Sequence, residues 1–416
     1  MNFLPLALER AGFSDLAAFQ RAQGLFPSGR EDWQTVQALL PYLLGYRLYT
    51  VARGDTYGAI AARVGTTVRA LITANPDQDP ERLRIGQTLT VPLGFPVVPT
   101  DQPFTYELLQ LCLDGLKARY PFLTVNAIGE TAQGRKLPQV AVGVGPRRVL
   151  VNAAHHANEW ITVPVVMKFL EEYARAISVN GQLYGYRAQD LYQRNVLHLV
   201  PMVNPDGVDL VTGVASPQEV AAARAISEDY PEIPFPAGWK ANLRGVDLNL
   251  NYPAKWEEAK ALKYELGFTT PAPRDYVGPE ALSEPESRAM YQSTELLLPD
   301  LVIAWHTQGR EIYWRFLDMA PAGSRELGLQ MAAASGYELE DVPATASFAG
   351  YKDWFIQDYD KPGYTVEAGL GENPLPLDQL PEIVRENLPI LLLGLSGGAG
   401  ESAAEPQAED IGERFG

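Results

Sequence analysis

Hydrophobic positions in the first 46 residues recur at the three- and four-residue spacing of amphipathic helices. The pattern covers three stretches, LPLALERAG, DLAAFQRAQGL and EDWQTVQALLPYL, with breaks at Gly12, Gly24 and Gly29. Because glycine commonly interrupts a helical pattern, three short helices are predicted over residues 1–46. A unit of this size buries little surface, so we expect a small packing or binding module.

Residues 47–93 show a different pattern. A strand-like YRLYTV opens the block, two helical stretches follow, and a strand-like IGQTLTVP closes it. Asp55 and Thr56 are both good N-cap residues, so the first helix is expected to start at one of them. The second helix, in TTVRALITANP, is expected to end before Pro76. The predicted order is strand, helix, helix, strand, and the proline-rich residues 94–102 are predicted to be a linker.

In residues 103–395, short apolar runs alternate with amphipathic stretches. Strand-like runs include LPQVAVGV, RRVLVNAA, RNVLHLVPMV, DLVIAWHT and YTVEAG, whereas ITVPVVMKFLEEYARAI has the pattern of a helix. This alternation predicts an α/β domain with a mixed, largely parallel central sheet flanked by helices. Residues 396–416 contain little apolar material, and this tail is predicted to be disordered.

The charge and composition of the chain argue against nucleic acid and membranes as binding partners. The formal net charge of −17 argues against binding nucleic acid or an anionic membrane surface through the overall field. The lone Cys112 cannot form an internal disulfide, and we expect it to be buried. No apolar run approaches the roughly 20 residues that span a bilayer, and the first residues lack the basic start of a signal peptide. Nucleic-acid binding and membrane insertion are therefore not expected, and the choice between cytoplasm and unconventional export stays open.

The motif HHANE follows the strand-like RRVLVNAA, at the strand end where α/β sheets place their ligands. The three-residue spacing of His156 and Glu159 lets both side chains converge on one point, and their donor atoms suit Zn²⁺. A third ligand must come from His155, His198 or His306. His198 lies among apolar residues, as a satisfied core histidine would, whereas His306 ends a strand. Two histidines and one glutamate would leave an open, catalytic coordination position, although an H-x-x-E pair also arises by chance.

The order of motifs resembles that of the zinc metallocarboxypeptidases, or funnelins. H-x-x-E-W, NPDG, GVDLN, a strand-end histidine and TVE follow one another over residues 103–395. The longer stretches HANEW, MVNPDGVDLV, WKANLRGVDLNLNYPAKW and AGYKDWFIQDYDKPGYTVE are similar to those of the bacterial γ-D-glutamyl-L-diamino acid endopeptidases. Those enzymes carry wall-binding LysM modules ahead of the peptidase domain and cut peptidoglycan stem peptides.

This resemblance implies roles for named residues. It implies one Zn²⁺ per chain, held by the ligand set His156, Glu159 and His306. Glu367 in YTVEAG matches the catalytic glutamate. Lys240 falls where the family places an arginine that polarises the scissile carbonyl, and a lysine there supplies a point charge but not the forked geometry. Asp247 in GVDLN would orient a ligand histidine through the ring nitrogen that does not bind the metal; the alternative is an aspartate that only stabilises a turn. His155 is expected to pack or to form hydrogen bonds locally.

The chain departs from the carboxypeptidase pattern where a free substrate C-terminus is bound. The usual Asn-Arg pair is Asn249-Leu250 here, and leucine cannot form a bidentate carboxylate clamp. Asn158 stands where an arginine is common. The mobile substrate-binding tyrosine of the family aligns near Thr345, and Tyr351 is the nearest candidate for its role. These departures weaken the interpretation as an exopeptidase.

Lys352 in GYKDW falls at the position of the family's specificity pocket. A cation there would favour an anionic group, such as the side-chain carboxylate of diaminopimelate. We therefore expect Lys352, with Arg244 as a weaker candidate, to bind a substrate carboxylate. A solvated surface lysine is the alternative. The predicted substrate-binding residues are thus Asn249, Lys352, Arg244 and Tyr351.

Residues 47–93 resemble a LysM module, on the motifs GDT, ANP and L-x-x-GQ-x-L-x-VP. The resemblance implies binding to glycans that contain N-acetylglucosamine, with a LysM fold that no longer binds as the alternative. Residues 1–46 partly resemble the helical peptidoglycan-binding domains. The groove of the module is expected at the following residues: Gly54, Asp55, Thr56, Tyr57, Asn75, Pro76 and Asp77.

The favoured hypothesis is a zinc peptidase held on peptidoglycan glycan by its LysM module. It would hydrolyse the bond between γ-D-glutamate and diaminopimelate or lysine in the stem peptide. One alternative is a zinc carboxypeptidase on ordinary peptides, against which Leu250 argues. Another is an inactive wall-binding protein, against which the retained ligands and Glu367 argue. The sequence does not indicate the oligomeric state.

Overall fold

The computed structural model describes residues 3–342 and 348–398. The chain forms two compact units. The N-terminal unit contains Met1–Pro99 and Glu107–Thr124, and the C-terminal unit contains Thr100–Tyr106 and Val125–Gly416. Two predicted features lie outside the described residues: the position near Thr345 and most of the tail predicted to be disordered.

The first part of the N-terminal unit consists of α1 (Leu4–Arg10), α2 (Leu16–Ala22) and α3 (Trp33–Leu44). Side-chain caps fix two of the helix starts, because Asp15 accepts a hydrogen bond from Ala18 N and Asp32 accepts one from Thr35 N, both at 2.8 Å. The three helices predicted from the spacing of apolar residues are confirmed.

The LysM-like block also has its predicted order: β1 (Tyr46–Thr50), α4 (Tyr57–Val64), α5 (Val68–Ala74) and β2 (Thr88–Pro92). The two strands pair antiparallel. Thr56 is the N-cap of α4, since its hydroxyl accepts from Ala59 N at 3.1 Å. The N-terminal unit also includes most of α6 (Tyr106–Arg119), which contains the buried Cys112, as expected.

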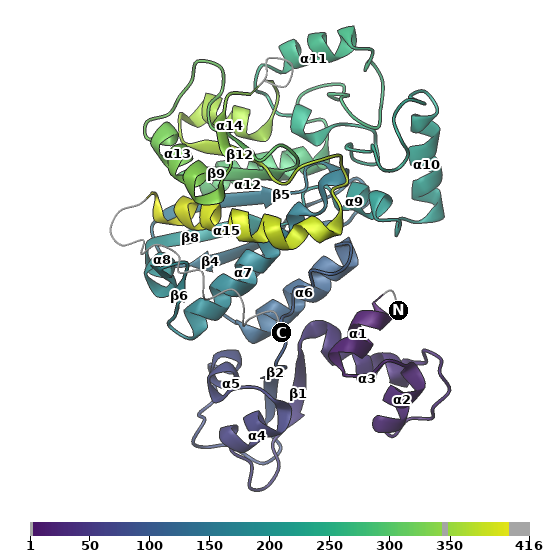
Figure 1. Cartoon of the computed structure of the whole chain (residues 1–416), viewed down its shortest axis with the longest axis vertical. Coiled ribbons are helices and arrows are strands. Elements are labelled where there is room, and N and C mark those ends of the chain that lie inside the picture. Colours follow the sequence, from purple (N-terminus) through teal and green to yellow (C-terminus); the bar gives the residue numbers. More distant parts are fainter. Residues whose placement is uncertain (1–2, 343–347, 399–416) are drawn as a thin grey trace. The chain divides into compact units, whose positions relative to one another are not determined.

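An eight-stranded sheet runs through the C-terminal unit in the order β11-β10-β12-β9-β5-β8-β4-β3. Figure 1 labels its strands β12, β9, β5, β8 and β4. β5 pairs parallel with β8 and β9, and β9 pairs parallel with β12. β10 is parallel to β11 but antiparallel to β12, and β4 is antiparallel to β8. The predicted mixed, largely parallel sheet is confirmed. Its strands are β3 (Thr124–Glu130), β4 (Lys136–Gly143), β5 (Arg147–Ala153), β8 (Asn195–Val200), β9 (Leu301–His306), β10 (Glu311–Tyr313), β11 (Glu338–Glu340) and β12 (Gly363–Glu367).

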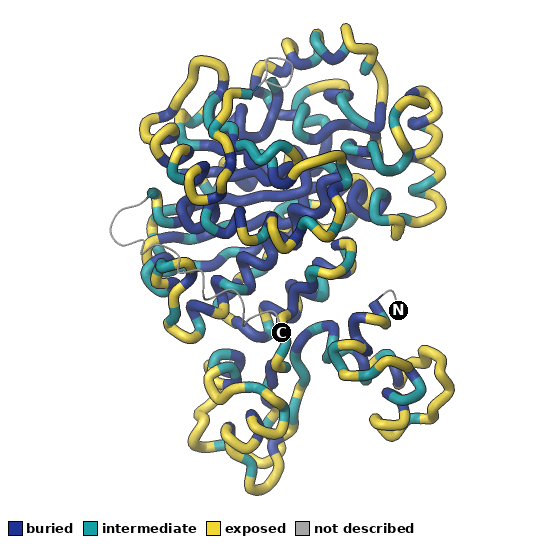
Figure 2. Tube along the Cα trace, viewed as in Figure 1, coloured by how far each residue is buried: buried dark blue, intermediate teal, exposed yellow. Residues whose placement is uncertain are grey.

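Helices cover both faces of this sheet, so β9 is buried along its whole length and β5 is buried from Val149 onward (Figure 2). Alternate residues of β9 point to opposite faces. Ile303 lies beneath Gly394 of α15, whereas Val302 and Ala304 belong to the core cluster that contains Trp354 of α14. The covering helices are α7 (Thr162–Ser178), α12 (Pro285–Leu297), α13 (Ser324–Ser335), α14 (Tyr351–Tyr359) and α15 (Leu380–Ser396).

The remaining elements connect these layers. They are the hairpin β6 (Gln182–Leu183) and β7 (Tyr186–Arg187), the helices α8 (Ala188–Arg194), α9 (Pro205–Val211), α10 (Pro217–Ser227) and α11 (Trp256–Glu265), and the short 3₁₀ turns η1 (Ala157–Glu159), η2 (Leu248–Leu250) and η4 (Leu377–Gln379). Among the described residues, no helix is both long enough and apolar enough to span a bilayer.

The parallel arrangement brings the carboxyl ends of β5, β9 and β12 to one edge of the sheet. Ala153 at the end of β5 is aligned with Trp305, and His306 at the end of β9 is aligned with Glu367 at the end of β12. Side chains that follow these strands therefore meet at a common place.

Candidate metal centre and active site

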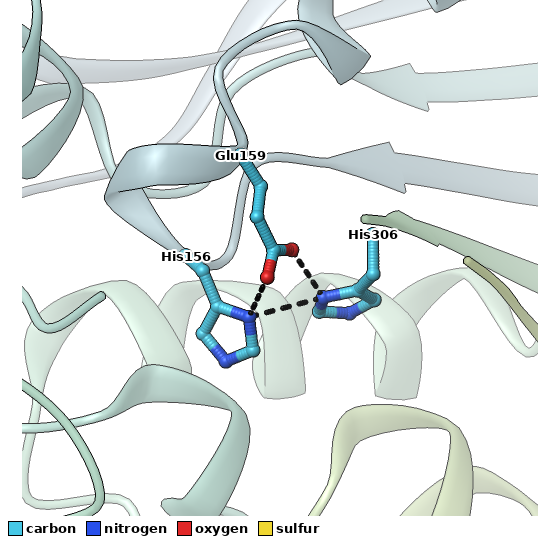
Figure 3. Close-up of side chains that lie close together, drawn as sticks. All are labelled: His156, Glu159 and His306. Carbon is cyan, nitrogen blue, oxygen red and sulfur yellow. Dashed lines mark hydrogen bonds and ion pairs between the residues drawn. The ribbon is translucent and has the colours of Figure 1, made fainter. Parts of the chain in front are cut away.

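Three side chains from two strand ends converge at this edge (Figure 3). His156 follows β5, Glu159 ends η1, and His306 ends β9. The Nδ1 atom of His156 lies 2.8 Å from Glu159 Oε1, and Nδ1 of His306 lies 2.9 Å from Glu159 Oε2. Within the described ranges, this is the one cluster of three or more His, Cys, Asp or Glu side chains whose ligand atoms converge, all lying within 4.8 Å of one another.

The geometry of this cluster fits Zn²⁺. The two Nδ1 atoms are 3.3 Å apart, and a tetrahedral ion with Zn–N bonds of about 2.0–2.1 Å would separate two nitrogens by about 3.3 Å. Glu159 and His306 are each 1% exposed, so the surrounding protein shields these two ligands from bulk water. Two imidazoles and one carboxylate also leave a coordination position open, as catalytic zinc sites do.

Backbone contacts hold the turn that carries Glu159. Ala157 N donates to Lys240 O at 3.0 Å, and Asn204 Nδ2 donates to Ala241 O at the same distance. Gly207 of the NPDG motif lies against this turn, where a Cβ atom would come within 2.7 Å of both Ala157 Cβ and Ala241 O. Only glycine fits such a close approach. NPDG therefore packs the metal-binding turn against the segment that carries Lys240.

Asp247 lies on the far side of the His156 ring. Its Oδ1 is 3.1 Å from Nε2 of His156, and its Oδ2 accepts a hydrogen bond from Asp275 N at 3.2 Å. Burial favours the neutral acid, but the adjacent His156 holds the pKa of Asp247 well below its usual range. Its carboxylate is therefore ionised and can accept a hydrogen bond from the ring nitrogen of His156 that faces away from the other ligands.

The other two histidines are not in the ligand cluster. His155 is fully buried, and its Nε2 lies 3.0 Å from the Tyr252 hydroxyl, which is the local bonding that we expected. His198 corrects a prediction, because it is half-buried and its buried Nδ1 has no hydrogen-bond partner among the described residues, so it is not a satisfied core histidine. Burial lowers the pKa of His198 to about 4 and that of His155 well below its usual value, which keeps both neutral.

Glu367 and Lys240 lie beside the ligand cluster. Glu367 is half-buried and is the register partner of His306. Burial, reinforced by the negative charge of Glu159, raises the pKa of Glu367 to about 8. Lys240 Nζ is 3.2 Å from Glu159 Oε1. Burial lowers the pKa of Lys240, but Glu159 outweighs it and raises the pKa above its usual value. A proton-transfer group and a fixed cation thus flank the three ligands.

The two cations predicted to bind a substrate carboxylate, Lys352 and Arg244, differ in their burial. Lys352 is 3% exposed, and its Nζ donates to Arg315 O at 2.7 Å and lies 2.5 Å from Asp353 Oδ1. The alternative of a solvated surface lysine is therefore wrong. Arg244 is exposed, with its Nε 3.5 Å from Oε2 of the buried Glu284. Both cations already have a carboxylate partner.

Tyr351 is fully buried in the core, where its hydroxyl lies 2.8 Å from Thr294 Oγ1. Its backbone N donates to Oδ1 of Asn249 at 3.0 Å. This packing gives no support to a contact between the Tyr351 side chain and substrate. It shows instead that the Asn249 side chain links η2 to the start of α14 through a hydrogen bond.

Within the LysM-like block, the predicted groove residues divide into two sets. Asp55 is tied to Tyr49 at 2.6 Å and Arg63 at 3.0 Å, and Asn75 is bonded to both backbone groups of Thr90 at 2.8 Å. These two side chains, together with the buried Tyr57, shape the module. The exposed members of the predicted groove are Gly54, Thr56, Pro76 and Asp77.

Comparison with known proteins identifies the two domains. The zinc carboxypeptidase family model matches residues 109–390. The chain belongs to the zinc carboxypeptidase family. The LysM domain model matches residues 49–92. The protein is therefore a zinc metallopeptidase with a LysM domain, and His156, Glu159 and His306 are its zinc ligands.

Individual relatives support this assignment. The γ-D-glutamyl-L-diamino acid endopeptidase 1 of Lysinibacillus sphaericus is 41% identical over 73% of this chain and 75% of its own. An uncharacterised protein of Bacillus subtilis is 39% identical over 65% of this chain and 72% of its own. Carboxypeptidase A from Helicoverpa armigera matches the fold with a TM-score of 0.57 at 20% identity, over 73% of this chain and 76% of that chain.

One cation near the site was not predicted. Arg274 follows Pro273, whose carbonyl accepts hydrogen bonds from the backbone N–H groups of Lys240 and Ala241 at 2.8 and 2.9 Å. The sequence PAPRDY matches no motif, and residue 274 is far from the ligands along the chain. Only the folded structure places this arginine beside Lys240.

Proposed function

We propose that this zinc metallopeptidase hydrolyses the bond between γ-D-glutamate and the diamino acid, diaminopimelate or lysine, of peptidoglycan stem peptides. The observation that carries the proposal is the complete and convergent ligand set His156, Glu159 and His306 in a chain 41% identical to an endopeptidase of that specificity. The LysM domain ahead of the peptidase domain supports the same substrate.

Each residue near the metal has a chemically reasonable part in amide hydrolysis. A bound Zn²⁺ would supply a Lewis acid, which polarises a carbonyl and makes water more acidic. Glu367 takes a proton from the attacking water and returns it to the nitrogen of the leaving amine. Lys240 places a positive charge near the carbonyl oxygen as negative charge develops there. Asp247 holds the His156 ring so that Nδ1 faces Glu159 and His306, where it would bind the metal.

The residue at position 250 favours an endopeptidase. Leu250 packs against the apolar cluster of Trp256 and Ala349, where a carboxypeptidase would present an arginine to the substrate's C-terminus. A leucine side chain offers no hydrogen bond to a carboxylate. Cleavage at this site therefore does not depend on a terminal carboxylate held at position 250.

The LysM domain supplies the second half of the proposal, which is binding to peptidoglycan glycan through the exposed edge around Gly54, Thr56 and Asp77. A bound glycan raises the local concentration of stem peptides near the peptidase. Soluble N-acetylglucosamine oligomers are therefore expected to slow hydrolysis of insoluble peptidoglycan but not of a soluble tripeptide. A contribution of residues 1–46 to wall binding stays a prediction.

The test compares two tripeptides that differ only in how glutamate is linked. The full chain is incubated with L-Ala-γ-D-Glu-meso-diaminopimelate or with its α-linked isomer, and release of the free amine is followed over time. Cleavage of the γ-linked peptide alone, abolished by a chelator and restored by Zn²⁺, supports the proposal. Equal or faster cleavage of the α-linked peptide would contradict it.

A further inference from the structure

The short segment Pro273–Asp275 forms hydrogen bonds with active-site residues at both of its ends. Pro273 O accepts hydrogen bonds from Lys240 N and Ala241 N, at 2.8 and 2.9 Å. Asp275 N donates to Oδ2 of Asp247 at 3.2 Å, and Oδ1 of the same carboxylate faces His156. Arg274, the residue between these two attachments, is therefore held beside Lys240 and the His156–Asp247 pair.

The guanidinium of Arg274 retains donors for a ligand. Its Nε is 2.7 Å from Asp275 Oδ2, and the other oxygen of that carboxylate lies 2.5 Å from Lys263 Nζ. In the described part of the chain, no hydrogen bond joins either Nη group of Arg274 to a protein acceptor. The side chain is 39% exposed, so these groups can be reached from solvent. The charge of Arg274 also interacts with those of Glu159, Asp247 and Lys240.

The other cations considered for substrate binding lack this freedom. Lys240 lies 3.2 Å from Glu159, and Lys352 lies 2.5 Å from Asp353 within the core. Arg244 lies 3.5 Å from the fully buried Glu284. Arg274 also shares its carboxylate partner with Lys263, so the group formed by Arg274, Asp275 and Lys263 keeps a net positive charge.

The proposed substrate has an anion that suits such a cation. When glutamate is joined through its γ-carboxyl group, its α-carboxylate stays free on the acyl side of the scissile bond. Three carbons separate this carboxylate from the scissile carbonyl. After most other residues a peptide bond leaves no carboxylate at that place, whereas an α-linked glutamate carries its side-chain carboxylate at the same separation and differs in where its amino group branches. Arginine binds a carboxylate with two parallel hydrogen bonds, which fixes its position as well as its charge.

This inference rests on the proposed function: we propose that Arg274 binds the free α-carboxylate of the D-glutamyl residue through its Nη groups and thereby selects stem peptides in which this carboxyl group is not amidated. Arg274 acts as a specificity-determining residue on the acyl side of the cleavage point. It adds a second cation to Lys240 in a site that also holds Glu159 and Glu367, and it does so from a segment that carries none of the family motifs.

The experiment uses two substrates that differ at this one group: L-Ala-γ-D-Glu-meso-diaminopimelate and its α-carboxamide, in which D-glutamate is replaced by D-isoglutamine. The value of kcat/KM is measured for each with wild type, Arg274→Gln, Arg274→Lys and the exposed control Arg325→Gln, all checked for zinc content. Because a charge-assisted hydrogen bond contributes about a 10- to 100-fold effect, Arg274→Gln should lose about that factor on the carboxylate substrate. It should lose little on the carboxamide.

Wild type and Arg325→Gln are expected to prefer the carboxylate, and Arg274→Lys should retain part of that preference, because lysine keeps the charge but not the two-pronged geometry. Equal losses on both substrates in Arg274→Gln, or no loss on either, would overturn the role of Arg274 and leave the proposed function standing. Wild-type protein that cuts neither tripeptide would overturn the proposed function itself, and this assignment with it.

Discussion

Asp247 and His156 form a partly buried pair in which Oδ1 of the carboxylate lies 3.1 Å from Nε2 of the imidazole. The opposite nitrogen of the same ring, Nδ1, faces Glu159 and His306. Such a pair fixes which nitrogen carries the proton and how the ring is turned, and it makes the imidazole a stronger ligand. The zinc site therefore extends beyond the three side chains that bind the metal.

Replacing Asp247 by asparagine keeps the size of the side chain but removes its charge. The amide can no longer stabilise the His156 ring as a carboxylate does, so zinc affinity should fall about 10- to 100-fold. Competition with a chromogenic chelator measures this change, with the exposed Asp318→Asn as control. Unchanged zinc affinity in Asp247→Asn would show that the pair does not support the metal.

Glu367→Gln should remove proton transfer without removing zinc. We expect kcat to fall about 10²- to 10⁴-fold while one equivalent of zinc stays bound, as measured by steady-state kinetics and metal analysis. Glu311→Gln is the matched control, because Glu311 is the register partner of Glu367 in β10 and its carboxylate accepts a hydrogen bond from the Tyr313 hydroxyl at 2.6 Å. An equal loss in the Glu311 variant would argue against a special role for Glu367.

Leu250 leads to a prediction about the C-terminal carboxyl group of the substrate. With no arginine at position 250, amidation of the C-terminal carboxyl group of L-Ala-γ-D-Glu-L-Lys should change kcat/KM by only a few-fold. An enzyme that clamps this carboxylate would lose about 10- to 100-fold, the usual size of a charge-assisted interaction. The products of both peptides are identified and kcat/KM is compared. A loss of kcat/KM of about 10- to 100-fold on amidation would favour the carboxypeptidase alternative.

Glu286 predicts a pH dependence of stability. Burial raises the pKa of this fully buried carboxyl to about 7 from its ordinary value of 4.5. The folded protein therefore binds the proton more tightly than the unfolded chain, so its contribution to stability is full below pH 4.5 and is lost as the pH rises to about 7. At about 1.4 kcal/mol for each pH unit, the loss is about 3 kcal/mol.

Glu286→Gln should remove this contribution, since glutamine does not titrate. The free energy of unfolding of the variant, measured with denaturant at several pH values, should rise relative to that of wild type between pH 4.5 and 7. The exposed Glu382→Gln should follow wild type. If the Glu286 variant also tracks wild type across this range, the carboxyl does not titrate as described.

Much of the fold could be predicted because its signals are local. The spacing of apolar residues predicted α1, α2 and α3, and the alternation of strand-like and helical stretches predicted the mixed sheet. His156, Glu159 and His306 were identifiable as metal-ligand candidates because each follows or ends an apolar strand. Four histidines in the whole chain left few combinations to consider.

Other features depend on contacts between distant segments. Glu367 is one of 51 acidic residues and could be singled out only through the family motif. Thr56 rather than Asp55 caps α4, because Tyr49 and Arg63 bind the Asp55 carboxylate. The burial of Lys352 against Asp353 and the attachment of Arg274 beside Lys240 follow from tertiary packing that no local pattern encodes.

The most direct measurement is mass spectrometry of the products from L-Ala-γ-D-Glu-meso-diaminopimelate-D-Ala, a peptide that offers both candidate bonds in one molecule. A Glu367→Gln sample and a chelated sample serve as controls. The proposed γ-D-glutamyl endopeptidase predicts release of L-Ala-D-Glu together with meso-diaminopimelate-D-Ala, absent from both controls. Release of D-Ala alone, with the γ-D-glutamyl bond intact, would contradict it and identify a carboxypeptidase.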